Sequence, residues 1–155
     1  MGESAFYGCS SLASATIGNA VENINSSTFY NCKSLENIKF GTGVKTIGKN
    51  TFYGCSSLQT IEMPKNVISI GDYAFDNCSK LSNVIIEDRD ALLTLGSNGS
   101  SPMFSDCPLD SVYIGGDISY KTTSKYGYSP FYNNKTLRAV TITDKETEIS
   151  DNEWQ

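Results

Sequence analysis

A motif that recurs every 23 residues constrains this chain more than any other feature of its sequence. Phe6, Phe29, Phe52 and Phe75 lie 23 residues apart. Each is followed three residues later by a cysteine, and a leucine comes three residues after that cysteine. The four segments read AFYGCSSL, TFYNCKSL, TFYGCSSL and AFDNCSKL. Two further units, MFSDCPL and PFYNNKTL, follow at wider spacing. Self-similarity at a fixed period of this length is typical of a repeat protein.

The apolar residues that follow each anchor leucine predict a short strand. They occupy the third and fifth positions after the leucine and alternate with a mostly polar residue, which is the pattern of a half-buried strand. A turn then leads to a valine and an isoleucine, such as Val44 and Ile47. Because one 23-residue coil cannot bury its apolar face alone, the coils must stack and pair their strands in a parallel sheet. The apolar pairs are Ala15 and Ile17, Ile38 and Phe40, Ile61 and Met63, Val84 and Ile86, Val112 and Ile114, and Val140 and Ile142.

The repeated unit resembles the leucine-rich repeats of the BspA-like (Treponema pallidum-type) family, which read approximately LxxIxIPxxVxxIGxxAFxxCxxL. Residues 58–81, LQTIEMPKNVISIGDYAFDNCSKL, match this pattern almost letter for letter. The resemblance covers essentially the whole chain. It implies a single leucine-rich-repeat solenoid over residues 1–155, of the mainly β or α/β class. This would be a right-handed curved coil of six repeats with a short parallel sheet on its concave face.

The same resemblance implies a function and a location. Proteins of this repeat class are bacterial and protist surface proteins, and many are linked to adhesion. We therefore expect a non-enzymatic binding scaffold, part of a cell-surface or secreted adhesin, whose partner is a protein or a glycan. One alternative is a purely structural spacer. A second is a carbohydrate-active enzyme on a parallel β-helix that uses Asp88 and Asp90, although no paired acids recur at equivalent positions of the repeat.

Both ends of the sequence divide a repeat. Met1 stands where the repeat has an isoleucine, and Trp154 stands where it has the phenylalanine. Solenoids need polar capping repeats to cover their core, and neither end reads as one. We interpret the chain as a piece of a longer repeat array. The alternative is a complete small protein whose open ends are covered by end-to-end self-association.

The composition excludes several classes of function. The chain has no histidine, which removes Ser-His and Cys-His catalysis and the usual zinc ligand sets. Its net charge of -5 argues against a nucleic-acid partner, which requires a basic surface. No run of apolar residues exceeds three, so no membrane insertion is expected. We expect no cofactor and no metal.

The cysteines and aromatic residues of the repeat are expected to form columns. All five cysteines occupy one repeat position, and we interpret them as buried free thiols rather than a redox or metal site. The anchor phenylalanines are expected to stack in the core. The tyrosines that follow them, Tyr7, Tyr30, Tyr53 and Tyr132, are interpreted as a half-buried ladder, and the alternative is that they stack on a partner.

The outward positions of the strands are the candidate binding residues. The position between the two core residues of each strand holds Lys39, Glu62, Ile85 and Tyr113 in the second to fifth repeats. Because Ile85 and Tyr113 are neighbours in this series, we expect them to form an apolar patch. A longer spacing after Phe104 predicts a loop that carries Tyr120, Tyr126 and Tyr128, which we expect to form an adaptable rim. The alternatives are an ordinary polar surface and a loop without function.

Overall fold

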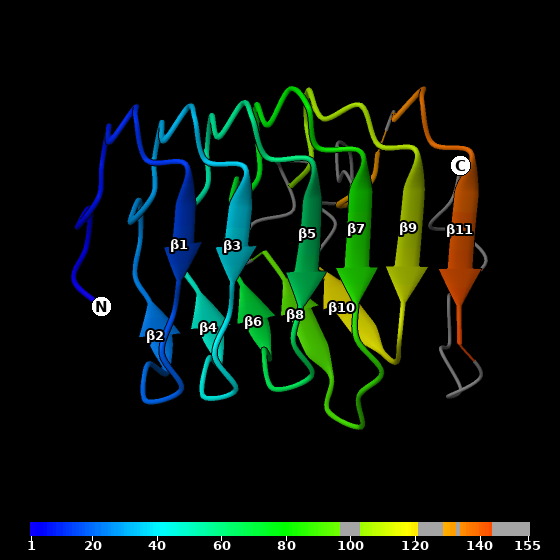
Figure 1. Cartoon of the computed structure of the whole chain (residues 1–155). Helices are drawn as coiled ribbons and strands as arrows, with labels where there is room; N and C mark the ends of the chain where they lie inside the picture. The colour runs from blue at the N-terminus through cyan, green and yellow to red at the C-terminus, as the bar shows by residue number, and fades with distance from the viewer. Residues whose placement is uncertain (97–102, 121–128, 133, 144–155) are drawn as a thin grey trace.

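The computed structural model describes residues 1–96, 103–120, 129–132 and 134–143. Within these ranges the chain forms eleven short strands and no helix, so no described helix could cross a membrane. The strands lie in two layers of a coil that advances from left to right in Figure 1. The front strands are β1 (Ser14–Thr16), β3 (Asn37–Lys39), β5 (Thr60–Met63), β7 (Asn83–Ile86), β9 (Ser111–Ile114) and β11 (Ala139–Ile142). The back strands are β2 (Asn23–Ile24), β4 (Thr46–Ile47), β6 (Ser69–Ile70), β8 (Leu93–Leu95) and β10 (Ile118–Tyr120).

The front strands pair in the register that the repeat predicts. All pairs are parallel, and Ile61, Val84, Val112 and Val140 follow one another across β5, β7, β9 and β11. Alternate side chains of these strands point inward, as the burial pattern of β5 shows with Ile61 and Met63 buried between exposed neighbours. The prediction of a mainly β solenoid with a parallel sheet is confirmed.

The back sheet is a feature that the sequence analysis did not predict. A turn was predicted to lead to the valine and isoleucine positions, and no strand was predicted there. The isoleucines Ile24, Ile47 and Ile70 lie in β2, β4 and β6, which belong to a continuous sheet in the order β10-β8-β6-β4-β2. Glycines let the intervening turns stack closely. A Cβ on Gly41 would lie 2.6 Å from the backbone of Gly18 in the preceding coil, which is closer than any side chain tolerates.

The core between the two sheets consists of residue columns. The rings of Phe6, Phe29, Phe52, Phe75, Phe104 and Phe131 stack with centroids 5.2–5.5 Å apart. Each buried cysteine donates its thiol to the carbonyl of the preceding coil's phenylalanine, as Cys55 does to Phe29 at 3.2 Å. The same bond recurs from Cys32, Cys78 and Cys107. The buried thiol ladder is therefore confirmed for these four residues, whereas Cys9 in the first coil is exposed.

The tyrosines form a second aromatic column beside the phenylalanines. Tyr7 stacks on Tyr30 with centroids 4.7 Å apart, and Tyr30 stacks on Tyr53 at 4.8 Å, with nearly parallel rings in both pairs. The faces of these rings are thus largely occupied by one another. This confirms the stacked ladder in the first three coils, in which Tyr30 and Tyr53 are half-buried as expected whereas Tyr7 is exposed. In the fourth coil Asp76 occupies the equivalent position.

The front sheet is interrupted between the second and third coils. β1 and β3 form one ladder and β5, β7, β9 and β11 form another, although the back sheet runs unbroken behind both (Figure 1). Phe40 follows β3 at the core position where the other coils carry isoleucine or methionine. Its larger ring packs edge-on against Phe52 of the next coil. We infer that this ring holds β3 and β5 too far apart for ladder hydrogen bonds.

Candidate binding face

The outward side chains of the front strands form two columns. The column between the core residues holds Thr16, Lys39, Glu62, Ile85, Tyr113 and Thr141, and the register places Glu62, Ile85, Tyr113 and Thr141 side by side. Ile85 and Tyr113 are half-buried, and Glu62 and Thr141 are exposed. The predicted apolar patch of Ile85 and Tyr113 is therefore a pair of directly paired neighbours on β7 and β9. The other column holds Ser14, Asn37, Thr60, Asn83, Ser111 and Ala139.

This pair of neighbours lies in an open hollow of about 290 Å³. The hollow spans β5, β7, β9 and β11, and its floor is the hydrogen-bonded backbone of these strands. No Lys, Arg, Asp or Glu is among the described residues that line it. Its lining residues are Thr60, Asn83, Val84, Ile85, Ser111, Val112, Tyr113, Ala139 and Thr141.

Tyr113 is held in place by a residue of the preceding coil. Its hydroxyl donates a hydrogen bond of 2.7 Å to Oδ1 of Asp88, in the turn after β7. This hydrogen bond is the main reason that the pKa of the Tyr113 hydroxyl is raised, with smaller contributions from burial and from the Asp88 charge. The phenol therefore remains a protonated donor at neutral pH. The sequence analysis named Asp88 only as a residue of the carbohydrate-active enzyme alternative. Its role as the partner of Tyr113 was missed because the insertion after β7 hides the register.

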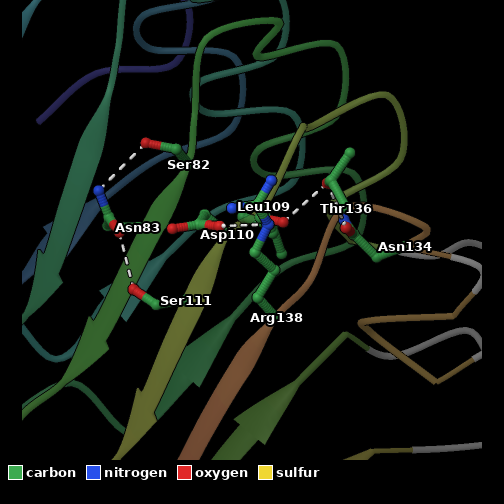
Figure 2. A network of polar contacts seen from close by, with 8 residues as sticks. All are labelled: Ser82, Asn83, Leu109, Asp110, Ser111, Asn134, Thr136 and Arg138. Atoms are coloured by element: carbon green, nitrogen blue, oxygen red, sulfur yellow. Dashed lines mark hydrogen bonds and ion pairs between the residues drawn. The ribbon is translucent and has the colours of Figure 1, made fainter.

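A polar network lies at the start of β7, β9 and β11 (Figure 2), and two of its residues, Asn83 and Ser111, also line the hollow. Ser111 donates its hydroxyl to Oδ1 of Asn83 at 2.7 Å, and the Asn83 amide donates to the Ser82 hydroxyl at 3.1 Å. In the next coil, Thr136 donates to the backbone carbonyl of Leu109 at 2.7 Å. The same network contains an ion pair between Arg138 and Asp110, at 3.5 Å, and the Asn134 side chain. These bonds tie neighbouring coils together and fix the side chains at the start of β7, β9 and β11.

Lys39 does not belong to the same surface as the other candidates. It lies on β3, on the far side of the interruption, where its register partner is Thr16 of β1. Its side chain is exposed, as is that of Glu62 at the edge of the second ladder. Within the described part of the chain the only ion pairs are Lys45 with Glu22 and Arg138 with Asp110, so no ion pair joins Lys39 to Glu62. The column expected along the whole sheet is thus divided in two.

Of the three tyrosines that were expected to form a rim, the structure describes one. Tyr120 was expected in a loop, but it is the last residue of β10 in the back sheet, and its half-buried side chain packs against the core. The strand continues to this residue because it pairs with Leu95 of β8. Tyr126 and Tyr128 lie outside the described residues, so their expected role stays a prediction.

Two further features bear on chemistry. Among the described residues, no three acidic or cysteine side chains come close enough together to hold a metal ion. A second hollow of about 450 Å³ lies at the turns of the first three coils, where Asn19, Thr42 and Asn66 link neighbouring turns by hydrogen bonds. Its lining includes the Lys45–Glu22 ion pair and two apolar residues, Ala20 and the exposed Ile68. No aromatic side chain is among the described residues that line this second hollow.

The repeat itself identifies the family. The BspA type leucine rich repeat region matches residues 1–123 in six copies. The chain belongs to the BspA-type leucine-rich-repeat family. No curated protein sequence matches this BspA-type chain.

Solved structures of leucine-rich repeat proteins share the fold. A leucine-rich repeat protein from Bacteroides ovatus aligns with 90% of the BspA-type chain at 28% identity and a TM-score of 0.66. The T. pallidum leucine-rich repeat protein aligns with 90% of it at 24% identity and a TM-score of 0.66. The chain spans 32% of the length of the first protein and 60% of the second.

Proposed function

We propose that the chain is a non-enzymatic binding module of a cell-surface or secreted adhesin, which recognises a protein or a glycan through its front sheet. The observation that carries this proposal is the half-buried pair Ile85 and Tyr113 in an open hollow of the sheet. An apolar and aromatic pair surrounded by polar side chains is the usual composition of an interface core with its rim. Membership of a repeat-scaffold family supports the same reading.

The construction of the face suits binding without rearrangement. The backbone under the hollow is fixed by ladders between β5, β7, β9 and β11. Tyr113 is anchored through Asp88, and Ser111 is bonded to Asn83, so these side chains are already ordered before a partner arrives. Pre-organisation of this kind lowers the entropy cost of association.

The test is a binding screen with a matched pair of variants. The folded protein is immobilised, and its binding to extracellular-matrix proteins and to a panel of glycans is measured by interferometry. The double variant Ile85→Asp/Tyr113→Asp places two negative charges in the hollow. The control variant Ser14→Asp/Thr16→Asp adds the same charge to exposed positions of β1, in the other ladder of the front strands and outside the hollow.

The expected result is saturable binding that the hollow variant loses and the control variant keeps. Circular dichroism and thermal unfolding of both variants exclude a folding defect as the cause. Binding that survives in the hollow variant would refute the front-sheet site. A screen without any saturable partner would favour the spacer interpretation over the binding module.

A further inference from the structure

The hollow of the front sheet offers neutral hydrogen-bonding groups beside one aromatic ring. Thr60, Asn83, Ser111 and Thr141 contribute hydroxyl and amide groups along its length. Hydroxyls act as donors and acceptors at once, and an amide presents two donors and an acceptor. Asn83 and Ser111 use only part of this capacity in their mutual bond. Such groups complement a ligand that is itself rich in hydroxyls.

Tyr113 supplies the aromatic ring of the hollow. Tyr113 stands on β9, while its hydroxyl is bound to Asp88 in the preceding coil. This hydrogen bond fixes the position of the Tyr113 hydroxyl relative to the turn after β7. The residue is half-buried, so part of the ring remains exposed. An aromatic face carries a partial negative charge that attracts weakly positive C–H groups.

The charges around the hollow select against acidic ligands. Glu62 adjoins Ile85 in the register, and Asp88 accepts the bond from Tyr113. No cationic side chain is among the described lining residues. Like charges brought together without a counter-charge are unfavourable, so a sulfated, uronic or phosphorylated ligand is disfavoured.

The backbone of the hollow also selects against an extended peptide. Peptides that add to a sheet need a free strand edge with unpaired N–H and C=O groups. β7 and β9 are each hydrogen-bonded to a strand on both sides, and the unpaired edges of this described ladder are those of β5 and β11. Recognition beside Ile85 and Tyr113, at the centre of the hollow, must therefore proceed through side chains.

We propose that the hollow binds a neutral pyranose of a glycan, with a C–H face of the sugar on the Tyr113 ring and its hydroxyls bonded to Asn83 and Ser111. This inference rests on the proposed binding function and names the ligand class of the same face. The residues of the hollow contribute to binding in two ways. The ring provides contact area, and the amide and hydroxyl groups orient the sugar.

The test is a titration of the ¹⁵N-labelled protein with neutral oligosaccharides, followed by NMR. The probes are maltotriose, cellotriose, lactose and diacetylchitobiose, and sialyllactose is the acidic comparison. Tyr113→Ala removes the ring. Tyr113→Phe keeps the ring and removes the hydroxyl that Asp88 holds. Tyr7→Ala is the matched control, because Tyr7 is an exposed tyrosine of the other aromatic column, away from the front sheet.

The expected result is saturable shifts at the amides of Ile85, Ser111 and Tyr113 with at least one neutral probe. Affinity should fall about tenfold in Tyr113→Ala, which is the upper part of the range for one aromatic contact. It should fall less in Tyr113→Phe and stay unchanged in Tyr7→Ala. Sialyllactose should bind more weakly than lactose.

Three outcomes would overturn the saccharide proposal. These are no saturable shift with any neutral probe, shifts confined to another surface, and unchanged affinity in Tyr113→Ala. The proposed binding function has a separate readout. A matrix protein that still binds after enzymatic deglycosylation, and loses binding in Ile85→Asp/Tyr113→Asp, would support the binding face while excluding a sugar as its ligand.

Discussion

The ring of Phe40 meets the ring of Phe52 edge-on, with centroids 6.0 Å apart and an interplanar angle of 86°. The two residues belong to successive coils, and between these coils the front sheet is interrupted. In the intact parts of the sheet the corresponding coils are joined by bonds such as those from the amide of Ile17 to the carbonyl of Lys39. The Phe40–Phe52 contact therefore lies at the place where the front sheet is interrupted.

Replacing Phe40 with isoleucine should close the interruption. A smaller side chain would let β3 approach β5, and the amides of residue 40 and Gln59 would then gain ladder hydrogen bonds. The measurement is amide hydrogen exchange, in which these two amides should become slower, while the amide of Ile17 changes little. Met63→Ile is the control and should leave exchange at residue 40 as it is. Unchanged exchange in Phe40→Ile would show that the ring is not the cause.

Asp76 should make the protein less stable as the pH rises. Its Oδ1 atom is buried without a hydrogen-bond partner, and burial raises the pKa of the carboxyl group to about 6 from an ordinary 3.8. Because the pKa is higher in the folded state, the folded protein binds this proton more tightly. The resulting stabilisation is complete below about pH 4 and is lost as the pH rises through 6.

Asp76→Asn should therefore be more stable than the natural protein at pH 7.5, by about 1–2 kcal/mol after allowance for solvent screening. The difference should shrink toward zero at pH 4. Urea unfolding at both pH values measures it. Asp106→Asn should show a smaller gain in the same direction, because the Asp106 charge also raises the pKa of Asp76. Equal stability of Asp76→Asn and the natural protein at pH 7.5 would contradict this account.

Tyr73 occupies a backbone conformation that its side chain disfavours. Its φ of 57° is shared by Ser4, Ser27 and Asn50 at the same repeat position, and these residues are smaller. A bulky residue at positive φ is strained, whereas asparagine tolerates this region. We expect Tyr73→Asn to raise the free energy of unfolding by about 0.5–1 kcal/mol.

The Tyr73 ring also makes a favourable contact with Lys49. The experiment must distinguish the loss of this contact from the relief of backbone strain. Lys49 Nζ lies 5.6 Å from the centroid of this ring. An exposed cation–π contact is worth about 0.5 kcal/mol, so it offsets part of the strain. Lys49→Gln measures this contact alone in the same urea unfolding assay. A loss of stability in Tyr73→Asn that exceeds the effect of Lys49→Gln would refute the strain argument.

The cysteines should divide into one reactive and four unreactive thiols. Cys9 is exposed and the other four are buried in the described structure. Burial raises the pKa of the Cys55 thiol to about 12, so it contains almost no thiolate at neutral pH. Ellman's reagent should therefore titrate one thiol per folded chain and five in denaturant. Cys9→Ser should abolish the rapid reaction. Rapid reaction of a second thiol would show that the ladder opens.

The candidate face was only partly predictable. Ile85 and Tyr113 could be paired from the sequence because both stand between core residues of consecutive repeats, and the register follows from those residues. Asp88 could not be assigned to Tyr113, since it follows β7 in a segment where the repeat spacing changes. Tyr120 was placed in a loop for the same reason, although pairing with Leu95 keeps it in a strand.

The sequence by itself determined the stacking order of the coils and the membership of the core columns. The reason is that apolar residues recurring every 23 positions can be buried together in only one register. The tertiary structure alone decided the back sheet, the interruption between β3 and β5, and the anchoring of Tyr113 by Asp88. These features depend on contacts between neighbouring coils, such as the Phe40–Phe52 packing and the Tyr113–Asp88 hydrogen bond, which join residues at separations other than the regular spacing of the repeat.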